Sequence, residues 1–308
     1  MLKYAIRRLL EMVPTTAGIV LLAFALFNVV GGSPAETILG KNTSAEAIAA
    51  FNHKYGYDKP LVFALDSQFT SFARDLLRGD FGWSVEMNEP VAEILKRGIG
   101  PSLSLTVPIL AGGAIVALMF AILAAASRTA DRAILLVSTV LTSVNYVVWV
   151  LAGQFLLAFK AGIFPIWGYG GWTYLLLPVL IGIVSSLGAD VRFFRTAILD
   201  ELYKPYVLAV RAKGISRAAI MTRHVLRNAL IPIATYISLS IPYLFTGSLL
   251  LESFFGIPGL GSVSINAIHS SDMAVVRALV VLGALICQGV NLATDLLYAA
   301  LDPRVRVG

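Results

Sequence analysis

Charged side chains are scarce in this chain. Asp, Glu, Lys and Arg together make up 14% of its 308 residues, whereas hydrophobic residues make up 57%. Soluble domains carry about a quarter charged residues, so the shortage excludes an ordinary soluble domain and predicts a polytopic membrane protein. The net charge of +6 does not point to nucleic acid, because the excess of Lys and Arg gathers at the edges of apolar runs.

Groups that carry enzyme chemistry are also few. The single cysteine, Cys287, cannot form a disulfide within the chain, and the three histidines are far apart in the sequence. No Walker-type nucleotide loop is present, because the Gly-Lys pair Gly40-Lys41 is followed by Asn42 in place of Ser or Thr. No zinc-protease or nucleophile-elbow pattern occurs either. We therefore do not expect an enzyme, and we predict no metal site.

Acids are rare within the apolar runs. The two that come nearest to the membrane interior, Asp190 and Asp295, both fall toward predicted cytoplasmic helix ends. A proton-coupled carrier would more often place an acid near the middle of the membrane. We interpret both carboxylates as interfacial or helix-packing groups in preference to proton carriers.

Long apolar runs dominate what is present. They predict six transmembrane helices, at about residues 9–30, 102–126, 133–159, 175–194, 229–251 and 274–301. The first would be about 33 Å long as a helix, which spans a bilayer and is long for the core of a cleaved signal peptide. Six spans with the short basic loops inside place both termini in the cytoplasm. Lys160 and Arg277 are the exceptions.

Three parts are predicted along the chain. Residues 1–30 hold the cytoplasmic N-terminus and the first transmembrane helix. Residues 31–100 are too polar to cross the membrane and are interpreted as an extracytoplasmic cap segment of short helices, one of them at 90–97. Residues 101–308 form a five-helix core with a cytoplasmic loop at 195–228. An outer loop without Lys or Arg follows the fifth span, and its candidate positions are Glu252, Phe255, Pro258, Gly259 and Gly261.

The loop between the fourth and fifth spans is strongly basic. Pro205 can open a short helix there, because its missing N–H would be unpaired in any case. Gly214 can close that helix in a left-handed conformation, and Ser216 can cap a second helix. We predict a helix–Gly–helix elbow where a cytoplasmic partner docks; the alternative is a basic loop that only sets topology and meets lipid headgroups. Residues 206–235 contain no acid, and their basic side chains are Arg211, Lys213, Arg217, Arg223 and Arg227, with His224.

Several spans carry small or polar residues at helical spacing. Such stripes fit close helix packing, and they fit a polar translocation path equally well. The candidate path residues are Asn145, Thr235, Ser238, Thr246, Asn291 and Thr294.

Strings of residues in the basic loop match a known pattern. They are Val210-Arg211-Ala212-Lys213-Gly214, Arg223-His224, Leu226-Arg227-Asn228-Ala229-Leu230 and Pro232, and further strings such as Leu77-Arg78-Gly79-Asp80-Phe81-Gly82 and Pro258-Gly259-Leu260-Gly261 agree along nearly the whole chain. Together they resemble the membrane subunits of binding-protein-dependent ABC importers, in the oligopeptide/dipeptide/nickel branch. The general signature of that superfamily begins Glu-Ala-Ala, whereas this chain has Leu208-Ala209-Val210, which puts in doubt any contact of that Glu with the ATPase.

The resemblance implies an architecture and partners. It implies an all-α, type I ABC importer permease fold of six transmembrane helices, with a segment of roughly 70 residues, 31–100, outside the membrane. It implies a bacterial or archaeal cell membrane, a second homologous permease, two ATPase subunits that use ATP and Mg, and an extracytoplasmic solute-binding protein. It implies no cofactor bound by this chain.

The resemblance also assigns roles within the basic loop. The helix from Pro205 to Gly214 would be the coupling helix. It would be seated in a cleft of an ATPase, with Tyr206, Ala209 and Val210 as a small apolar face. The coupling positions are Pro205, Tyr206, Ala209, Val210, Arg211, Ala212, Lys213 and Gly214. The lever positions that lead into the fifth span are Ser216, Arg223, His224, Arg227, Asn228 and Pro232.

The expected function is the import of short peptides, or of a related small solute, driven by ATP hydrolysis in partner subunits. Nickel chelates, glutathione-like solutes and oligosaccharides stay open, because selectivity in this architecture is largely set by the binding protein. The alternatives from other classes are a self-contained secondary carrier and a non-transporting scaffold or receptor. The lack of a mid-membrane acid and of an obvious inverted repeat argues against the carrier.

Overall fold

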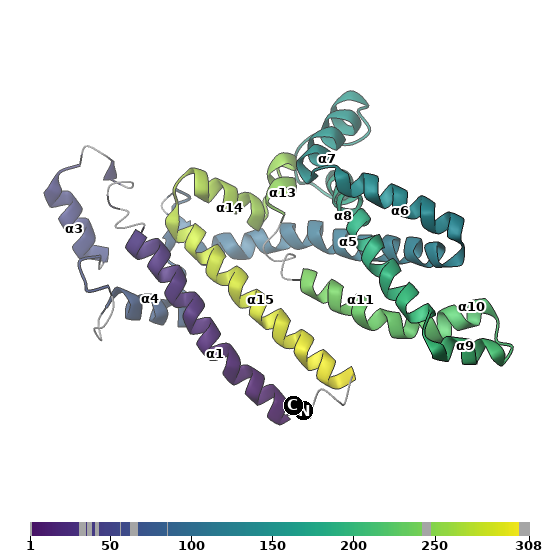
Figure 1. Cartoon of the computed structure of the whole chain (residues 1–308). Helices are drawn as coiled ribbons and strands as arrows, with labels where there is room; N and C mark the ends of the chain where they lie inside the picture. The colour runs from purple at the N-terminus through teal and green to yellow at the C-terminus, as the bar shows by residue number, and fades with distance from the viewer. Residues whose placement is uncertain are drawn as a thin grey trace. The chain divides into compact units, whose positions relative to one another are not determined.

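The chain is almost entirely helical. Within the described residues, the regular structure is helical apart from one short antiparallel pair, β1 (Trp83–Ser84) and β2 (Glu89–Pro90) (Figure 1). The chain forms two compact units, residues 1–101 with 259–308, and residues 102–258. The all-α fold class expected from the apolar runs is confirmed. The computed structural model describes residues 2–30, 35, 39–40, 43–55, 57–61, 67–84, 86–241 and 248–301.

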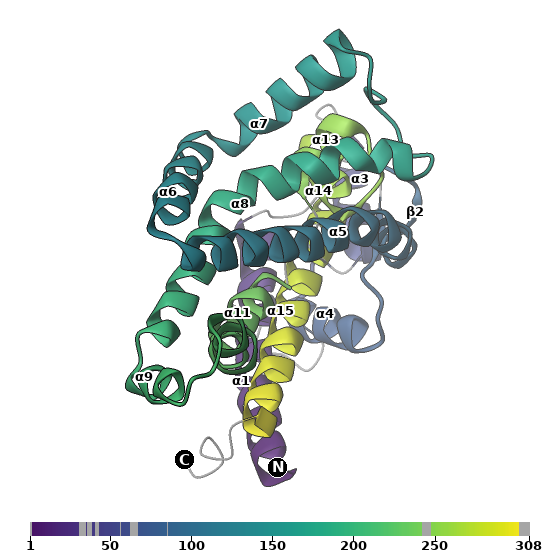
Figure 2. The same cartoon turned by 90° about the vertical axis from the view of Figure 1, so that its right-hand side faces the viewer.

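Two long helices frame the first unit. α1 (Leu2–Phe24) continues as a π-helical stretch (Ala25–Val30) and lies alongside α15 (Met273–Leu301) in both views (Figures 1 and 2). Within this pair the Thr16 hydroxyl donates to the side-chain oxygen of Gln288 at 2.5 Å. A hydrogen bond between two apolar helices fixes their register as well as their contact.

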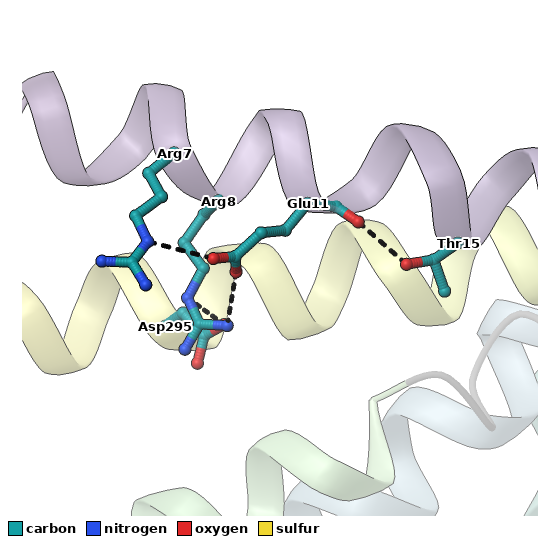
Figure 3. A network of polar contacts seen from close by, with 5 residues as sticks. All are labelled: Arg7, Arg8, Glu11, Thr15 and Asp295. Atoms are coloured by element: carbon teal, nitrogen blue, oxygen red, sulfur yellow. Dashed lines mark hydrogen bonds and ion pairs between the residues drawn. The ribbon is translucent and has the colours of Figure 1, made fainter.

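An ionic network joins the same two helices near the chain termini (Figure 3). Arg8 Nε lies 3.3 Å from a carboxylate oxygen of Asp295, and Glu11 accepts hydrogen bonds from Arg7 and Arg8 at 3.1 and 3.2 Å. Thr15 donates its hydroxyl to the Glu11 carbonyl at 2.9 Å. Asp295 thus makes the helix-packing contact that its place at a helix end predicted.

Short helices complete the first unit. α3 (Ala45–Tyr55) and α4 (Gln68–Leu77) follow α1 in sequence, and α14 (Leu260–His269) precedes α15. The start of α5 (Val91–Ala126) also belongs here. The buried core of this unit consists of Val91, Ile94, Leu95, Leu260, Ala267, Val275 and Ala278.

Arg277 is a cation in the first turns of an otherwise apolar helix, and its surroundings explain how it is tolerated. Its Nη1 donates to Asn28 Oδ1 at 3.2 Å, and its guanidinium carbon lies 4.7 Å from the centre of the Phe72 ring. Phe24 of α1 packs against Phe69 and Phe72 of α4, with ring centres 5.3 and 6.0 Å apart. α4 is therefore attached to both α1 and α15 through Arg277 and aromatic contacts.

The second unit is built from the rest of α5 and the helices that follow it. Two buried clusters form its core, one around Val191, Phe194 and Ile198, the other around Leu105, Leu177 and Phe255. Its further helices are α6 (Arg128–Ser143), α7 (Tyr146–Gly153) with a π-helical continuation (Gln154–Lys160), α8 (Trp172–Leu202), α9 (Pro205–Ala212), α10 (Arg217–Ile220), a π-helical stretch (Met221–Val225), α11 (Leu226–Ser240) and α13 (Leu249–Phe255).

Two expected boundaries are wrong. A short helix at 90–97 and a separate span at 102–126 are one continuous helix, α5. Gly98 lies at this junction and serves packing, since a Cβ at this position would lie 2.8 Å from Leu260 Cδ2. The missing side chain lets the helix and Leu260 approach closely.

The third expected span, at 133–159, is also not one helix. It is bent by 87° between Arg128–Ser143 and Tyr146–Lys160. Asn145 causes the break, because its backbone is extended and its Oδ1 accepts the N–H of Val147 at 2.9 Å, which caps α7. An Asn side chain that bonds to nearby backbone competes with helix continuation.

The long apolar helices number between four and six, and the second broken pair coincides with the expected loop at 252–261 and not with the expected fifth span. Among the described residues, four helices could cross a membrane by length and composition, and up to six if two broken pairs are each one span. The fifth expected span, at 229–251, is not seen as one helix, since α11 ends at Ser240 and residues 242–247 lie outside the described part. The four helices are Arg7–Asn28, Val91–Ala126, Trp172–Leu202 and Met273–Asp295; the pairs are Arg128–Ser143 with Tyr146–Lys160 and Leu249–Phe255 with Leu260–His269.

The outer segment from Glu252 to Gly261 was expected to be a loop and is mostly helical. α13 continues to Phe255 and α14 begins at Leu260, so only residues 256–259 form a turn. Gly256 ends α13 in the left-handed region, with φ +66°. A glycine in this conformation is a common helix stop.

Candidate functional site

The predicted elbow is present at α9. Lys204 is extended, Pro205 occupies the first helical turn, and α9 ends at Ala212. Gly214 follows in the left-handed region with φ +76°, and its N–H donates to the Arg211 carbonyl at 3.0 Å. These are the start and stop signals expected from the sequence, and the local structure confirms both.

A second helical segment follows the glycine. The hydroxyl oxygen of Ser216 accepts a hydrogen bond from the N–H of Ala219 at 3.4 Å, and Ser216 thereby caps α10 (Arg217–Ile220). α10 continues through the π-helical stretch Met221–Val225 into α11. In Figure 1, α9 and α10 lie together, and Figure 2 shows α9 at the end of α8. The chain therefore turns sharply and returns into a long apolar helix.

The two faces of α9 differ from the expected ones. Val207 is buried, and Tyr206 and Val210 are half-buried against the core cluster around Phe194. Burying a valine side chain stabilises the fold by about 1.5 kcal/mol or more, so this side of α9 fixes the helix to its own protein. Tyr206 and Val210, which were predicted to belong to the apolar docking face, are thus partly engaged in packing within the protein, and their role in docking stays a prediction.

The outward face of α9 carries one large apolar residue. Leu208 is 66% exposed, and it occupies the first position of the Glu-Ala-Ala signature. Helical periodicity could have identified it, because it lies on the side opposite to Val207 and Val210. The other exposed positions on this helix and its turn are Pro205, Ala209, Arg211, Ala212, Lys213 and Gly214.

A buried carboxylate holds the inner side of the elbow. Glu201, at the end of α8, is only 6% exposed. Its Oε1 accepts hydrogen bonds from the Tyr206 hydroxyl and from Asn228 Nδ2, both at 2.9 Å, and its Oε2 accepts one from Lys204 Nζ. Asn228 Nδ2 also lies 3.3 Å from the Tyr206 oxygen. Three segments, the end of α8, the start of α9 and the start of α11, meet at this one side chain.

This contact changes the acid–base properties of its partners. The hydrogen bond from Lys204 to Glu201 raises the pKa of the lysine above its usual range. Burial raises the pKa of the Tyr206 hydroxyl. Both groups therefore keep their protons at neutral pH, and the network is complete there. Sequence reasoning missed Glu201, because it precedes the basic stretch that drew attention; the available signal was the acidic pair Asp200-Glu201 directly before a long run without any acid.

The lever positions are only partly brought together. Ser216 caps α10, Asn228 joins the Glu201 network, and Pro232 lies exposed within α11. The others share a shallow surface hollow of about 780 Å³, lined by Thr222, Arg223, His224, Leu226, Arg227 and Leu230. In the described part of the chain, no ion pair joins an acid to any of the five cations of the basic stretch, Arg211, Lys213, Arg217, Arg223 and Arg227.

α8 and α11 are also joined further along their length. The Tyr236 hydroxyl donates to Asp190 Oδ1 at 2.9 Å, and the rings of Tyr236 and Phe193 stack with centres 4.4 Å apart. Asp190 makes the helix-packing contact expected of it.

The candidate path residues do not form one described site. Asn145 caps α7, and Thr235 and Thr294 donate their hydroxyls to carbonyls of their own helices, at 2.9 and 2.8 Å. Ser238 is half-buried on α11, and Asn291 of α15 lies 3.9 Å from the sulfur of Cys287. Thr246 lies outside the described residues. A translocation path along these positions stays a prediction.

The outer-segment positions are structural in the described geometry. Glu252 is fully buried, and its Oε1 accepts hydrogen bonds from the Ser102 hydroxyl at 2.9 Å and the Ser248 N–H at 3.0 Å. Phe255 is buried, Pro258 is exposed, Gly259 caps α14 and Gly261 is buried in its first turn. A Cβ on Gly256 would lie 2.2 Å from Trp167, which explains the glycine.

Metal chemistry finds no support in the described residues. No group of three or more His, Cys, Asp or Glu side chains there is placed to hold a metal ion. What the geometry offers instead is an exposed elbow joined to long apolar helices.

Comparison with known proteins defines the class. Residues 98–307 match the family described as binding-protein-dependent transport system inner membrane component, and residues 1–106 match the N-terminal family of the same membrane components. The chain belongs to this family, the permeases of ABC importers. The resemblance drawn from the sequence strings is confirmed.

Individual relatives are similar over their full length. The glutathione transport system permease protein GsiC of Shigella flexneri serotype 5b is 32% identical, with 99% of each chain covered. GsiC of Salmonella typhimurium is 32% identical and GsiC of Escherichia coli K12 is 31% identical, again over 99% of both chains.

Proposed function

We propose that this chain is one of two membrane subunits of an ABC importer for short peptides, with glutathione-sized tripeptides as the first solutes to test. The single observation that carries the proposal is the α9 elbow, an exposed, capped helix fastened to long apolar helices in a chain of the permease family. The relatives named for glutathione transport support a small peptide as the solute.

In this proposal, the conformational change that ATP causes in the ATPase pair is transmitted to this chain through α9. Leu208 and Ala209 present an apolar patch to a cleft of the ATPase, and Arg211 and Lys213 flank it with positive charge. ATP and Mg are bound by the ATPase pair, and this chain binds neither. Closure of that pair on ATP moves α9, and the movement switches the membrane helices between inward- and outward-facing states.

The proposed assembly has two permeases, two ATPases and an extracytoplasmic solute-binding protein in the cell membrane. The loop 195–228 and both termini face the cytoplasm, because short loops rich in Lys and Arg stay inside. Residues 31–100 lie outside, where they are available to the binding protein. Substrate choice is then made largely before the solute reaches this chain.

Retention of the ATPase tests the docking face. Leu208→Asp places a charge on an exposed residue of α9, so the fold tolerates it while the apolar patch is lost. Leu77→Asp is the matched control, since Leu77 of α4 is 89% exposed. We expect Leu208→Asp to lower co-purification of the ATPase by about tenfold, the equivalent of 1.4 kcal/mol, and Leu77→Asp to leave it unchanged. Equal retention by both variants would reject α9 as the docking helix.

Uptake into proteoliposomes tests the class of transporter. The complete complex with its binding protein is supplied with radiolabelled glutathione, and with radiolabelled trialanine as a second probe. We expect uptake that requires ATP inside and survives collapse of the proton gradient. Uptake that ignores ATP and disappears with the gradient would instead establish a secondary carrier.

A further inference from the structure

The covalent connection from α9 to α11 is weak in its first part, residues 211–218, whereas Ile220 and Val225 further along are buried in the core. It passes through the turn at Gly214, the four-residue α10 and a π-helical stretch. Residues 211–218 are all exposed, and nothing lies within 4 Å of the position that a Cβ on Gly214 would take. A segment with so few packing contacts yields locally before it moves a long helix.

Glu201 provides a shorter connection. Its Oε1 holds Tyr206, the second residue of α9, and Asn228, the third residue of α11, each at 2.9 Å. The two partners are 22 residues apart in sequence, yet one carboxylate oxygen bridges them. Hydrogen bonds to an ionised group are about twice as strong as those between neutral groups, and they fix direction as well as distance.

A second contact makes α8 and α11 one unit. The Asp190–Tyr236 hydrogen bond lies eleven residues before Glu201 on α8, which is about 16 Å along an ideal helix. Two polar contacts at different heights resist both sliding and rotation of α11 against α8. The lever therefore consists of two helices, whereas the sequence suggested only the segment from Ser216 to Pro232.

We infer that Glu201 is a positioning residue that joins the coupling helix directly to α8 and α11, so that displacement of α9 reaches the membrane helices without passing through the Gly214 turn. This inference depends on the proposed function. The carboxylate touches neither solute nor nucleotide; it acts by keeping Tyr206 and Asn228 in place. Removing it leaves α9 able to dock, with the less directional apolar packing of Val207 as its remaining attachment to α8 and α11.

The test uses the complete importer in proteoliposomes and measures ATPase retention, ATP hydrolysis and uptake of radiolabelled glutathione or trialanine. For Glu201→Ala we expect the ATPase to stay bound while solute taken up per ATP hydrolysed falls about five- to tenfold, the lower end of the usual coupling between sites. Glu201→Gln keeps an acceptor oxygen and should fall less. Asp200→Asn is the matched control, because Asp200 is the adjacent exposed acid, and it should behave as wild type.

Two further measurements separate positioning from loss of fold. Amide hydrogen exchange of residues 206–212 should rise in Glu201→Ala and not in Asp200→Asn. Combining Glu201→Ala with Asn228→Ala should lower uptake per ATP no further than the first change alone, because both act through one contact. If Glu201→Ala does not assemble, Glu201→Gln and Tyr206→Phe carry the same measurement.

The outcomes are distinct. Normal uptake per ATP in the Glu201 variants, with wild-type coupling intact, overturns the inference and leaves the proposed function standing. A wild-type complex that retains no ATPase, or takes up solute without ATP, overturns the proposed function itself. If amide hydrogen exchange of residues 206–212 in Glu201→Ala stays at the wild-type level, the inference is also overturned, because the Glu201 contact then does not hold α9 in place.

Discussion

In each of the two units, one charged side chain attaches a short helix to two long helices, and the two charges have opposite signs. In the second unit, the buried carboxylate of Glu201 connects short α9 to α8 and α11. In the first unit, the half-buried guanidinium of Arg277 connects short α4 to α1 and α15. In each case a single ion within or at the end of an apolar helix fastens a short helix to two long ones.

The difference lies in how each ion is satisfied. Glu201 accepts directional hydrogen bonds from a hydroxyl, an amide and an ammonium group. Among the described residues, Arg277 has one amide oxygen and the face of an aromatic ring as its contacts. Directional bonds lose strength steeply when their angles change, whereas a cation over a ring tolerates sliding. The α9 attachment is thus suited to passing on movement, and the α4 attachment to holding a segment in place.

The largest effect should come from removing each ion. Glu201→Ala should lower stability by about 3 kcal/mol, since it opens a buried network, and Arg277→Ala by about 2 kcal/mol. The midpoint of thermal unfolding in detergent measures both. Arg78→Ala, at an exposed arginine directly after α4, should leave the thermal midpoint unchanged. A greater loss for Arg277→Ala than for Glu201→Ala would reverse the comparison.

Replacing Asn by Asp should lower stability at one of the two sites and should leave it unchanged or raise it at the other. Asn228→Asp sets a second carboxylate against Glu201 and should cost about 1–2 kcal/mol, a loss that acidification relieves when one carboxyl group takes up a proton. Asn28→Asp gives Arg277 an ionic partner and should be neutral or stabilising by up to about 1 kcal/mol. Thermal midpoints at neutral and mildly acidic pH report both. Destabilisation by Asn28→Asp as great as that by Asn228→Asp would show that Arg277 is not held as described.

Glycine substitutions should separate the elbow from the long helices. Gly214→Ala forces a side chain into the left-handed region, at φ +76°, and should cost about 1 kcal/mol. Gly289→Ala falls within α15 with nothing within 4 Å of its Cβ position, and should be neutral or stabilising by up to about 1 kcal/mol. Unfolding midpoints of the two variants should therefore move in different directions, and equal losses would contradict the assigned turn.

The smallest effect concerns Lys204. Its pKa is raised by Glu201, so its contribution to stability is complete below the ordinary lysine pKa and is lost as the pH rises through the raised value. The difference in unfolding midpoint between wild type and Lys204→Gln should be small, because the Lys204 side chain is more than half exposed. It should stay constant from pH 6 to about pH 9 and shrink at higher pH. A difference that grows with pH would have the wrong sign.

Local signals in the sequence were sufficient for the elbow. Pro205, Gly214 and Ser216 act on backbone within one turn of themselves, so their effect can be predicted without knowing the rest of the fold. The apolar runs likewise indicated a helical membrane protein. The bend at Asn145 was missed, since an Asn inside an apolar run can either cap a new helix or face a neighbour.

Long-range contacts were beyond such reasoning. Glu201 looked like an ordinary acid at a helix end, and only the fold brings Tyr206 and Asn228 to it. Arg277 looked like an exception to the charge rule until Asn28 and Phe72 were placed beside it. The inward turn of Tyr206 and Val210 also depends on the core that α9 covers. Each of these depends on partners far away in the sequence.

Arg277 has a consequence for how the protein is made. A cation costs about 2.5–3.5 kcal/mol on insertion at the centre of a membrane helix and less near its end, where Arg277 lies, and an acceptor that offsets part of this cost is Asn28, 249 residues earlier in the chain. The last helix is therefore expected to insert poorly by itself and to settle once the first helix, already synthesised, receives it. Ribosomal synthesis from the N-terminus supplies the two partners in the order that this arrangement needs.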